Sequence, residues 1–240
     1  MSKPLVSVVI PSFNEEKYLP RCLSSLQNQT FKNFEIIVVD NNSTDNTAQI
    51  ANKFGARVVK ETNQGMSRAR DKGFEEAKCE IITRTDADSI AEAKWLETIY
   101  DTFINNHQLV GITGNLLSPY KKIPNLIFKG WAYFLSVILG TACSGHIYLI
   151  GPNMAVRKSA WKKTIPHHDD SIIHEDIDLS CHLSEVGKLA FIPEMKVVLS
   201  GRKVDENPLK GLRDYLLKYP LRYLSTLRIH HPFLRRHKIA

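Results

Sequence analysis

Residues 5–40 read LVSVVIPSFNEEKYLPRCLSSLQNQTFKNFEIIVVD, and this stretch decides the fold. Its two ends, LVSVVIP (5–11) and FEIIVVD (34–40), are apolar along almost their whole length, as strands buried on both faces of a parallel sheet are. The residues between them, around 16–29, have the pattern of a helix. The stretch therefore predicts a strand, a helix and a second strand parallel to the first.

The same pattern continues to about residue 110. Further strands are expected at ARVVKE (56–61) and EIITRT (80–85), and further helices around 45–53, 66–78 and 92–106. This repetition predicts an α/β fold with an open, mostly parallel sheet and helices on both faces. In such a sheet, ligands bind outside the carboxyl ends of the strands.

Acidic, amide and hydroxyl side chains gather at these expected strand ends, in PSFNEE (11–16), DNNSTDNT (40–47) and TDAD (85–88). Within TDAD, Asp86 and Asp88 are separated by a single alanine. Such a pair either forms a polar turn, in which Asp88 or Ser89 caps the next helix, or holds a divalent cation together with a phosphorylated ligand. Neither GxGxxG nor GxxxxGK[ST] follows the first strand, which weakens the dinucleotide-oxidoreductase and P-loop interpretations.

The charge is distributed unevenly along the 240 residues, which carry a net charge of +7. Residues 201–240 contain 10 Lys plus Arg and 3 Asp plus Glu, which leaves 22 of each kind in the rest of the chain. A basic tail suits nucleic acid, an anionic membrane surface or water alone. The four cysteines lie far apart with no CxxC pair, which argues against a zinc site or a disulfide framework. With no signal-peptide pattern at the start, a cytoplasmic protein is expected.

Two parts are expected, a main domain over residues 1–205 and a basic amphipathic helical tail over 206–240. The tail suits an interfacial helix on anionic lipid, which we favour, or a helix packed on its own domain. Residues 125–151 are the most apolar stretch, but polar and glycine residues interrupt it, so buried packing or an interfacial lip is expected rather than a spanning helix. The leucines expected to form the apolar stripe of the tail are Leu209, Leu212, Leu216, Leu221, Leu224 and Leu227.

Six ordered blocks of the sequence resemble the inverting nucleotide-sugar glycosyltransferases of family 2, which have the GT-A fold. Residues 6–30 resemble the opening strand and helix of that family, and FEIIVVDNNSTDNT resembles its second strand and base-binding turn. NQGMSRARDKG, TRTDADS, GPNMAVRKSAW and HEDIDLSCHL follow in the family's order. The resemblance covers roughly residues 4–200, and an ordered set of blocks is far more specific than one motif.

The resemblance implies transfer of a single sugar, with inversion, from a nucleotide-diphosphate sugar to an acceptor hydroxyl. UDP-sugars are favoured and GDP-sugars are possible donors, while the acceptor is expected to be lipid-linked or a glycan. Asp176 is implied as the catalytic base, and Asp86 and Asp88 as ligands of Mg²⁺ or Mn²⁺ that bridges the diphosphate. Of Arg68 and Arg70 only one can face inward, and the resemblance points to Arg70 as a phosphate ligand. The implied substrate-binding residues are Pro11, Phe13, Glu15, Asp40, Asn42, Gly65, Arg70, Asp86, Asn153 and Glu175.

The sequence departs from the family in two ways. Where the family often has a histidine as a further metal ligand, VVLSGRKV offers Arg202, and the QxxRW block of processive synthases is absent. Three other classes stay open: a nucleic-acid binder, for which no binding signature is present; a non-catalytic sugar-nucleotide-binding or scaffold protein; and a metal-dependent phosphohydrolase. The preferred interpretation is a transferase on the cytoplasmic face of an anionic membrane, with no nucleic-acid partner.

Overall fold

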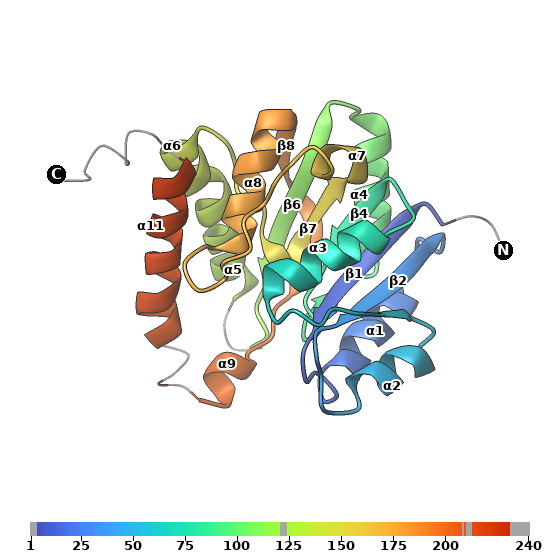
Figure 1. Ribbon diagram of the computed structural model, residues 1–240. Helices are drawn as coiled ribbons and strands as arrows, with labels where there is room; N and C mark the ends of the chain where they lie inside the picture. Colours follow the sequence, from blue (N-terminus) through green and yellow to red (C-terminus); the bar gives the residue numbers. More distant parts are fainter. Residues whose placement is uncertain (1–3, 121–123, 208, 210–212, 231–240) are drawn as a thin grey trace.

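The fold is that of a computed structural model, which describes residues 4–120, 124–207, 209 and 213–230 (Figure 1). Its centre is an eight-stranded sheet with the strand order β3-β2-β1-β4-β7-β6-β8-β5. Strands β3, β2, β1 and β4 are parallel, β7 runs antiparallel to both β4 and β6, and β6 is parallel to β8. The strands are β1 Val6–Ser12, β2 Phe34–Asp40, β3 Arg57–Lys60, β4 Ile81–Arg84, β5 Ile90–Ala91, β6 Leu109–Leu117, β7 Met154–Arg157 and β8 Lys188–Val198.

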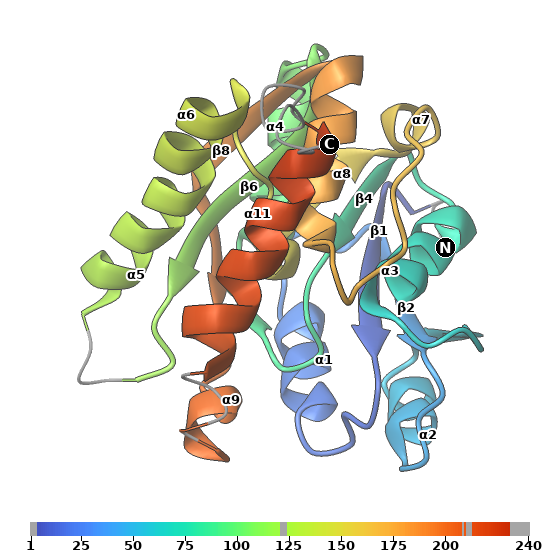
Figure 2. The ribbon, with the colours of Figure 1, turned by 60° about the vertical axis from the view of Figure 1, so that its left-hand side comes forward.

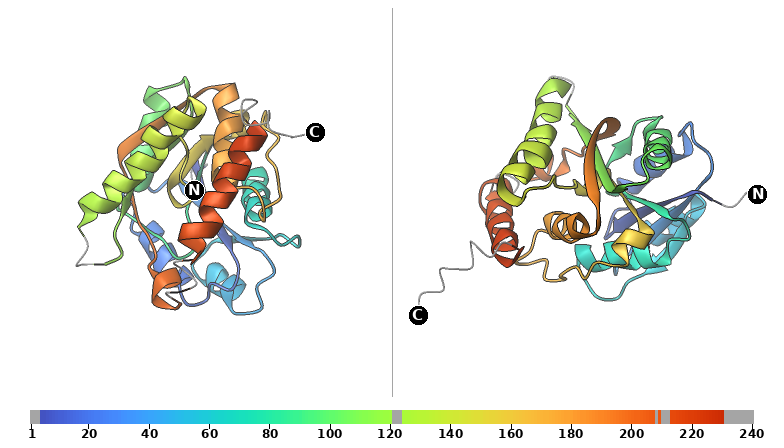
Figure 3. Two further views of the ribbon diagram at one scale, coloured as in Figure 1. Left: turned by 90° about the vertical axis from the view of Figure 1, so that its left-hand side faces the viewer. Right: turned by 90° about the horizontal axis from the view of Figure 1, so that it is seen from above.

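Helices cover both faces of the sheet, as predicted (Figure 3). One face packs against α1 (Leu19–Gln27), α2 (Thr47–Lys53) and α4 (Trp95–Asn105). The other face packs against α3 (Met66–Glu76), α7 (Lys158–Trp161) and α8 (Glu175–Val186). Strand β1 contributes to both apolar cores, because Val8 points to the first face and Val9 to the second. This two-sided burial explains why the strand is apolar at nearly every position.

The topology brings three strand ends to one edge of the sheet. Strand β1 lies between β2 and β4 and is parallel to both, with Ser12 opposite Asp40 and Val9 opposite Arg84. Helix α3 lies close over this region because residue 73 is glycine. A Cβ atom at Gly73 would come within 2.2 Å of Val9. The predicted polar strand ends therefore meet on one side of the molecule.

Residues 125–144 form a continuous helical segment made of α5 (Asn125–Tyr133), a π-helical stretch (Phe134–Leu139) and α6 (Gly140–Ser144). The expectation of buried packing is wrong for most of this segment. Its inward stripe consists of small residues spaced by four, Ala132, Ser136 and Gly140. The segment is long and apolar enough to cross a membrane by length and composition. Its large apolar side chains are mostly exposed, namely Leu126, Ile127, Trp131, Tyr133, Phe134 and Ile138.

The C-terminal helix α11 (Tyr219–His230) packs on the domain through one face, following α9 (Arg202–Asp205) and a π-helical stretch, Asp214–Lys218. Leu227 is buried against Tyr148, Ile177 and Cys181. Leu209, Leu221 and Leu224 are exposed, whereas residue 212 and the side chain of Leu216 lie outside the described part of the structure. Helix α11 and residues 125–144 lie on the same side of the molecule (Figure 2). Packing on the domain and an exposed apolar face therefore coexist in the tail.

Candidate active site

One buried arginine links two acids at the carboxyl edge of the sheet. Arg84, the last residue of β4, is 2% exposed. Its Nη1 donates to Oδ1 of Asp176 (2.8 Å) and its Nη2 donates to Oδ1 of Asp86 (3.1 Å). Burial disfavours a charged guanidinium, but the carboxylates of Asp176 and Asp86 outweigh it and raise the pKa of Arg84. This charged link joins an acid of the TDAD block to an acid of the HEDIDL block.

Asp176 lies in the first turn of α8 and is buried. Its Oδ2 accepts a hydrogen bond from the backbone N–H of Gly151 at 2.9 Å. A Cβ atom at Gly151 would lie 2.5 Å from this oxygen, so a larger residue would displace the carboxylate. Burial raises the pKa of Asp176, while the charge of Arg84 opposes the rise. A carboxylate with a raised pKa holds a proton more readily, as a general base requires.

Glu175, next to Asp176, has a different electrostatic role. Its Oε2 accepts a hydrogen bond from Nη2 of Arg222 in α11 at 2.8 Å. Burial alone would raise the pKa of Glu175, but positive charge at His174, Arg84 and Arg222 lowers it to about 2. Glu175 is therefore a fixed negative charge, and Asp176 is the stronger proton acceptor of the two.

Arg68 and Arg70 differ in burial, since Arg70 is fully buried and Arg68 is exposed, and the role of Arg70 as a phosphate ligand stays a prediction. Arg70 donates from Nε to Asp71 (2.7 Å) and from Nη1 to the backbone carbonyl of Glu175 (2.9 Å). Its Nη2 is buried and has no hydrogen-bond partner within the described part of the chain. An unpaired guanidinium N–H is costly to bury, and a phosphate oxygen is a partner of suitable charge and geometry.

The backbone before α3 requires a glycine at residue 65. Gly65 has a φ of +152°, a conformation that other residues rarely adopt. Its N–H donates to Oδ1 of Asn41 at 2.9 Å, and Asn41 also donates to the carbonyls of Glu61 and Asn63. Asn41 therefore fixes the approach to the helix that carries Arg70.

Arg202 binds two acids on the other side of the strand ends. It donates from Nη1 and Nη2 to the two carboxylate oxygens of Glu15, at 2.6 and 2.7 Å. Its Nε lies 2.8 Å from Oδ2 of Asp88. Burial raises the pKa of Glu15, and the hydrogen bond from Arg202 opposes this effect. Arg202 thus pairs with both acids and offsets one of their two negative charges.

The carboxylates of Glu15, Asp86 and Asp88 fit Mg²⁺ or Mn²⁺ by the chemistry of their donors, because both ions prefer oxygen ligands. Two of these acids are bound to Arg202, and Asp86 is bound to Arg84. A cation at Asp88 therefore competes with the guanidinium of Arg202 for the same carboxylate.

Asp40 and Asn42 lie where β2 ends. Oδ1 of Asp40 accepts a hydrogen bond from the N–H of Ser43 at 3.0 Å, so a turn occupies one of the two carboxylate oxygens of Asp40. Asn42 has a φ of +67°, and its Nδ2 donates to the carbonyl of Thr62 at 2.6 Å. A nucleobase contact by either residue stays a prediction.

Pro11 and Phe13 differ in accessibility at the end of β1. Pro11 is buried inside the strand, whereas the side chain of Phe13 is 47% exposed just beyond it. Phe13 can therefore offer a ring to a planar ligand, and Pro11 supports the strand beneath. Their predicted contact with the nucleotide is not tested by these positions.

The predicted substrate contact of Asn153 is corrected by its surroundings. Asn153 is fully buried; its Oδ1 accepts from Nε1 of Trp95 (2.8 Å) and its Nδ2 donates to the carbonyls of Asn115 (2.9 Å) and Met195 (3.0 Å). Because the side-chain amide is engaged inside the core, Asn153 holds β6, β8 and α4 together rather than facing a ligand.

Three residues that position Asp176 and Glu175 were not predicted from the sequence. Arg84 stands inside a strand that reads as buried, and a charged side chain there was a usable signal of a buried ion pair. Gly151 and Arg222 gave no such signal, because they meet Asp176 and Glu175 only after the chain folds.

The site and sheet together define a class. An α/β sheet that carries acids and arginines along the carboxyl edge of its strands, with a buried acid opposite them, has the architecture of a GT-A glycosyltransferase. The chain belongs to glycosyl transferase family 2, whose family model matches residues 7–164. The family and the fold predicted from the sequence are confirmed. Asp176 lies beyond the matched residues, so its role depends on geometry.

Curated relatives match this chain over parts of their own length. Glycosyltransferase GlyG of Streptococcus pneumoniae is 40% identical over 102 residues, which are 40% of this chain and 34% of GlyG. The chondroitin synthase of Pasteurella multocida is 30% identical over 194 residues, covering 77% of this chain and 19% of the synthase. The chain thus spans about a third or less of the length of these two relatives.

Solved structures agree on the fold. TarS of Staphylococcus aureus, residues 1–349 in complex with UDP-GlcNAc, superposes with a TM-score of 0.64 at 21% identity, covering 82% of this chain and 59% of that chain. Glucosyl-3-phosphoglycerate synthase of Mycobacterium tuberculosis, in complex with Mn²⁺, UDP and glucosyl-3-phosphoglycerate, gives a TM-score of 0.68 at 17% identity. It covers 95% of this chain and 80% of that chain.

Proposed function

We propose that this protein transfers one sugar from a nucleotide-diphosphate sugar to an acceptor hydroxyl, with inversion at the anomeric carbon. The observation that carries the proposal is the pair of hydrogen bonds that Arg84 donates, one to Asp86 and one to Asp176. One guanidinium separates the acid on the donor side from the proposed base. The reacting carbon of a donor bound beside Asp86 would then lie within reach of a hydroxyl held by Asp176.

Asp176 accepts the proton of the acceptor hydroxyl as that oxygen attacks the anomeric carbon. The new carbon–oxygen bond forms on the face opposite the bond that breaks, and the departing diphosphate keeps the electron pair. The hydrogen bond from Gly151 and the ion pair to Arg84 hold the Asp176 carboxylate in place. Both of its oxygens keep a further lone pair for the hydroxyl.

The proposed donor-binding site consists of the strand ends and the start of α3. The unpaired Nη2 of Arg70 is the proposed phosphate donor. Phe13 is the proposed wall of the base pocket. Asp40 is the proposed hydrogen-bond acceptor for the base, with Asn42 beside it. Asp86 and Asp88 are the residues that would hold Mg²⁺ or Mn²⁺, and a bound cation would neutralise charge on the leaving diphosphate.

The relatives support a UDP-sugar donor, with a GDP-sugar as the second possibility. The TarS structure contains UDP-GlcNAc, and the mycobacterial synthase structure contains UDP and Mn²⁺. Both share the fold of this chain, and the acids and Arg70 of this chain offer chemistry that suits a nucleotide diphosphate. The chondroitin synthase among the relatives supports a glycan acceptor, and a lipid-linked acceptor is the second possibility.

Replacing Asp88 with Ala is expected to weaken UDP binding in Mn²⁺ by at least about 10-fold, because it removes a ligand of the cation. Isothermal titration of UDP and of GDP, each with Mn²⁺ and with a chelator, measures this effect for wild type and Asp88→Ala. Asp101→Ala, an exposed acid on α4, is the matched control. Equal affinity in all four combinations of protein and metal would remove the metal from the proposal.

The apolar side of the molecule supports attachment to a membrane surface. Residues 125–144 and α11 lie on the same side of the molecule (Figures 2 and 3), and both carry exposed apolar side chains. The basic tail, proposed as a unit over residues 206–240 beside a catalytic domain over 1–205, would add attraction to anionic lipid. We place the protein on the cytoplasmic face of a membrane, where a lipid-linked acceptor is accessible.

Polar replacement of this apolar surface is expected to abolish sedimentation with vesicles that contain anionic lipid, because the apolar anchor is lost. The variant Leu126→Ser, Ile127→Ser, Leu221→Ser and Leu224→Ser removes only exposed side chains, and Ile104→Ser on α4 is the control. Wild-type binding should also weaken as salt screens the lipid charge. Sedimentation that is unchanged by the four substitutions would contradict the proposal.

A further inference from the structure

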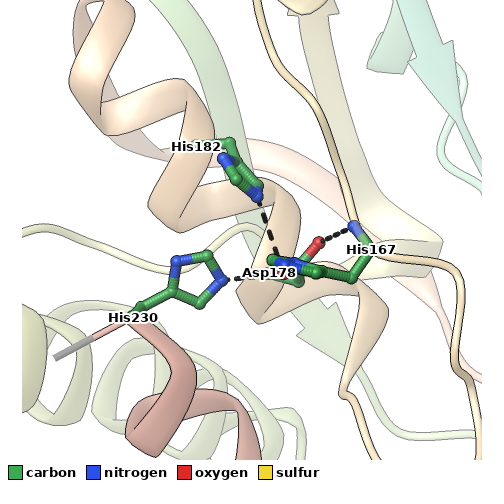
Figure 4. A group of neighbouring side chains, drawn as sticks. All are labelled: His167, Asp178, His182 and His230. Atoms are coloured by element: carbon green, nitrogen blue, oxygen red, sulfur yellow. Dashed lines mark hydrogen bonds and ion pairs between the residues drawn. The ribbon is translucent and has the colours of Figure 1, made fainter.

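Three histidines surround one buried carboxylate, Asp178, which lies two residues after Asp176 in α8 but belongs to a separate cluster (Figure 4). His167 comes from the loop before α8, Asp178 and His182 from α8 itself, and His230 from the end of α11. One ligand atom from each of the four residues lies within 4.8 Å of the other three. No resemblance or proposed reaction step uses this cluster. The cysteine pattern, which argued against zinc, does not bear on it.

The distances are close to those of a tetrahedral metal site. Oδ1 of Asp178 is 2.7 Å from Nδ1 of His167, 2.7 Å from Nε2 of His230 and 3.8 Å from Nε2 of His182. Tetrahedral Zn²⁺, with bonds of about 2.0–2.1 Å, places its ligand atoms roughly 3.3–3.4 Å apart. To match these separations, the two distances of 2.7 Å would lengthen by about 0.6 Å and the distance of 3.8 Å would shorten by about 0.4 Å.

Two features distinguish the cluster from an ordinary network of hydrogen bonds. Nε2 of His182 is buried and has no hydrogen-bond partner in the described part of the chain. Asp178, which is fully buried, already accepts two ring nitrogens on a single oxygen, while its other oxygen accepts the backbone N–H of His167 at 2.9 Å. A cation among these atoms would use the lone pairs of all three rings, and the N–H of His167 would keep the carboxylate oriented.

We propose that His167, Asp178, His182 and His230 bind a transition-metal ion, with Zn²⁺ as the ion of best fit. Imidazole and carboxylate ligands in a four-coordinate arrangement suit Zn²⁺ better than Mg²⁺ or Ca²⁺, which prefer oxygen ligands and higher coordination numbers. The ring of His167 is partly exposed and provides a route of entry. With all four positions supplied by the protein, the site is structural.

The site would fasten α11 to α8 beside the proposed base. His230 and Arg222 belong to α11, and they contact Asp178 and Glu175 on either side of Asp176. Binding of Zn²⁺ would hold the C-terminal helix against the first turns of α8, and so stabilise the folded state. The metal-binding claim does not depend on the proposed transfer reaction.

The test uses the full chain stripped of metal with a chelator and titrated with Zn²⁺ against a chromophoric competitor. We expect one equivalent bound to wild type, with affinity at least about 100-fold weaker in His182→Ala and His230→Ala. The exposed His107, in the turn between α4 and β6, provides the control variant His107→Ala. Asp88→Ala separates this ion from any cation held by the TDAD acids, because it should leave Zn²⁺ binding to the cluster unchanged.

Co²⁺ provides a readout that does not depend on how well each variant folds. Wild type loaded with Co²⁺ should show the intense visible absorption of a tetrahedral site, and Zn²⁺ should abolish it by competition. Zn²⁺ at about 100 times its dissociation constant should also raise the melting temperature of wild type by roughly 5–10 °C. A weak octahedral spectrum, or equal Zn²⁺ affinity in wild type and His182→Ala, would overturn the proposal.

Discussion

Asp176→Asn is expected to lower the rate of sugar transfer by roughly 100-fold or more, with the affinity for the donor retained. Asparagine keeps the shape of the side chain but cannot take the proton of the acceptor hydroxyl. Donor binding should persist because the proposed donor contacts lie on Arg70, Asp86 and Asp88. The expected effect is on turnover, which separates a base from a binding residue.

The same substitution has a structural effect that must be measured separately. The carboxylate of Asp176 accepts from both Arg84 and Gly151, and an amide can offer an oxygen to only one of them. We expect Asp176→Asn to lower the free energy of unfolding by about 1–3 kcal/mol. Helix capping, an alternative role for a first-turn acid, predicts a smaller loss of the free energy of unfolding. In the described structure, the side chain of Asp176 makes no hydrogen bond to the N-terminal N–H groups of α8.

Donor affinity, melting temperature and transfer rate should be measured on one preparation of Asp176→Asn, with the donor and acceptor that support turnover. Asp101→Asn, an exposed acid on α4, controls for loss of a negative charge. Transfer close to that of the wild type would leave Asp176 as a structural acid. The search for a base would then move to Glu175, whose low pKa makes it a weaker candidate.

Arg84→Met is expected to destabilise the fold by about 3–5 kcal/mol, because it leaves the buried carboxylate of Asp176 without its counter-charge. Methionine fills a similar volume but supplies no charge. The side chain of Arg84 is 2% exposed and that of Asp176 11%, so water can compensate for little of the loss. The free energy of unfolding, measured in urea, provides the value for each variant.

A double-mutant cycle identifies the cause of this loss. Asp176→Asn in the Arg84→Met background removes the unpaired charge, so the double variant should be more stable than Arg84→Met alone. Arg57→Met, which breaks partly exposed ion pairs with Glu35 and Glu76 and a hydrogen bond to the carbonyl of Glu76, is the control and should cost less than Arg84→Met, because water reaches these partners. If the two single losses are additive, Arg84 and Asp176 are not coupled and the link proposed for the active site is wrong.

The parts of the fold that could be predicted are those in which one short stretch of sequence carries the pattern of a strand or a helix. Strands β1, β2 and β4 were predictable because both of their faces are buried, which makes them apolar at nearly every position. The burial of residues 125–144 was not predictable, since apolar composition alone cannot tell a buried helix from one with an exposed apolar face.

The candidate site was predictable where one strand end or one helix turn carries the signal, as at Asp86, Arg70 and Asp176. It was not predictable where two distant segments meet. The contacts of Arg222 with Glu175 and of His230 with Asp178 depend on how α11 packs on α8, and no spacing within either segment records that packing. The predicted substrate contact of Asn153 rested on its place in a block that resembles the family. Its side-chain amide is instead engaged inside the core, which the sequence does not reveal.

A crystal structure of the full chain with UDP and Mn²⁺ would show directly whether the strand ends bind the donor. We expect the diphosphate within hydrogen-bond distance of Nη2 of Arg70, the base beside Asp40, and the cation on Asp86 and Asp88 with Arg202 displaced from Asp88. UDP bound away from the carboxyl ends of β1, β2 and β4, with Arg70 and Asp88 untouched, would contradict this expectation.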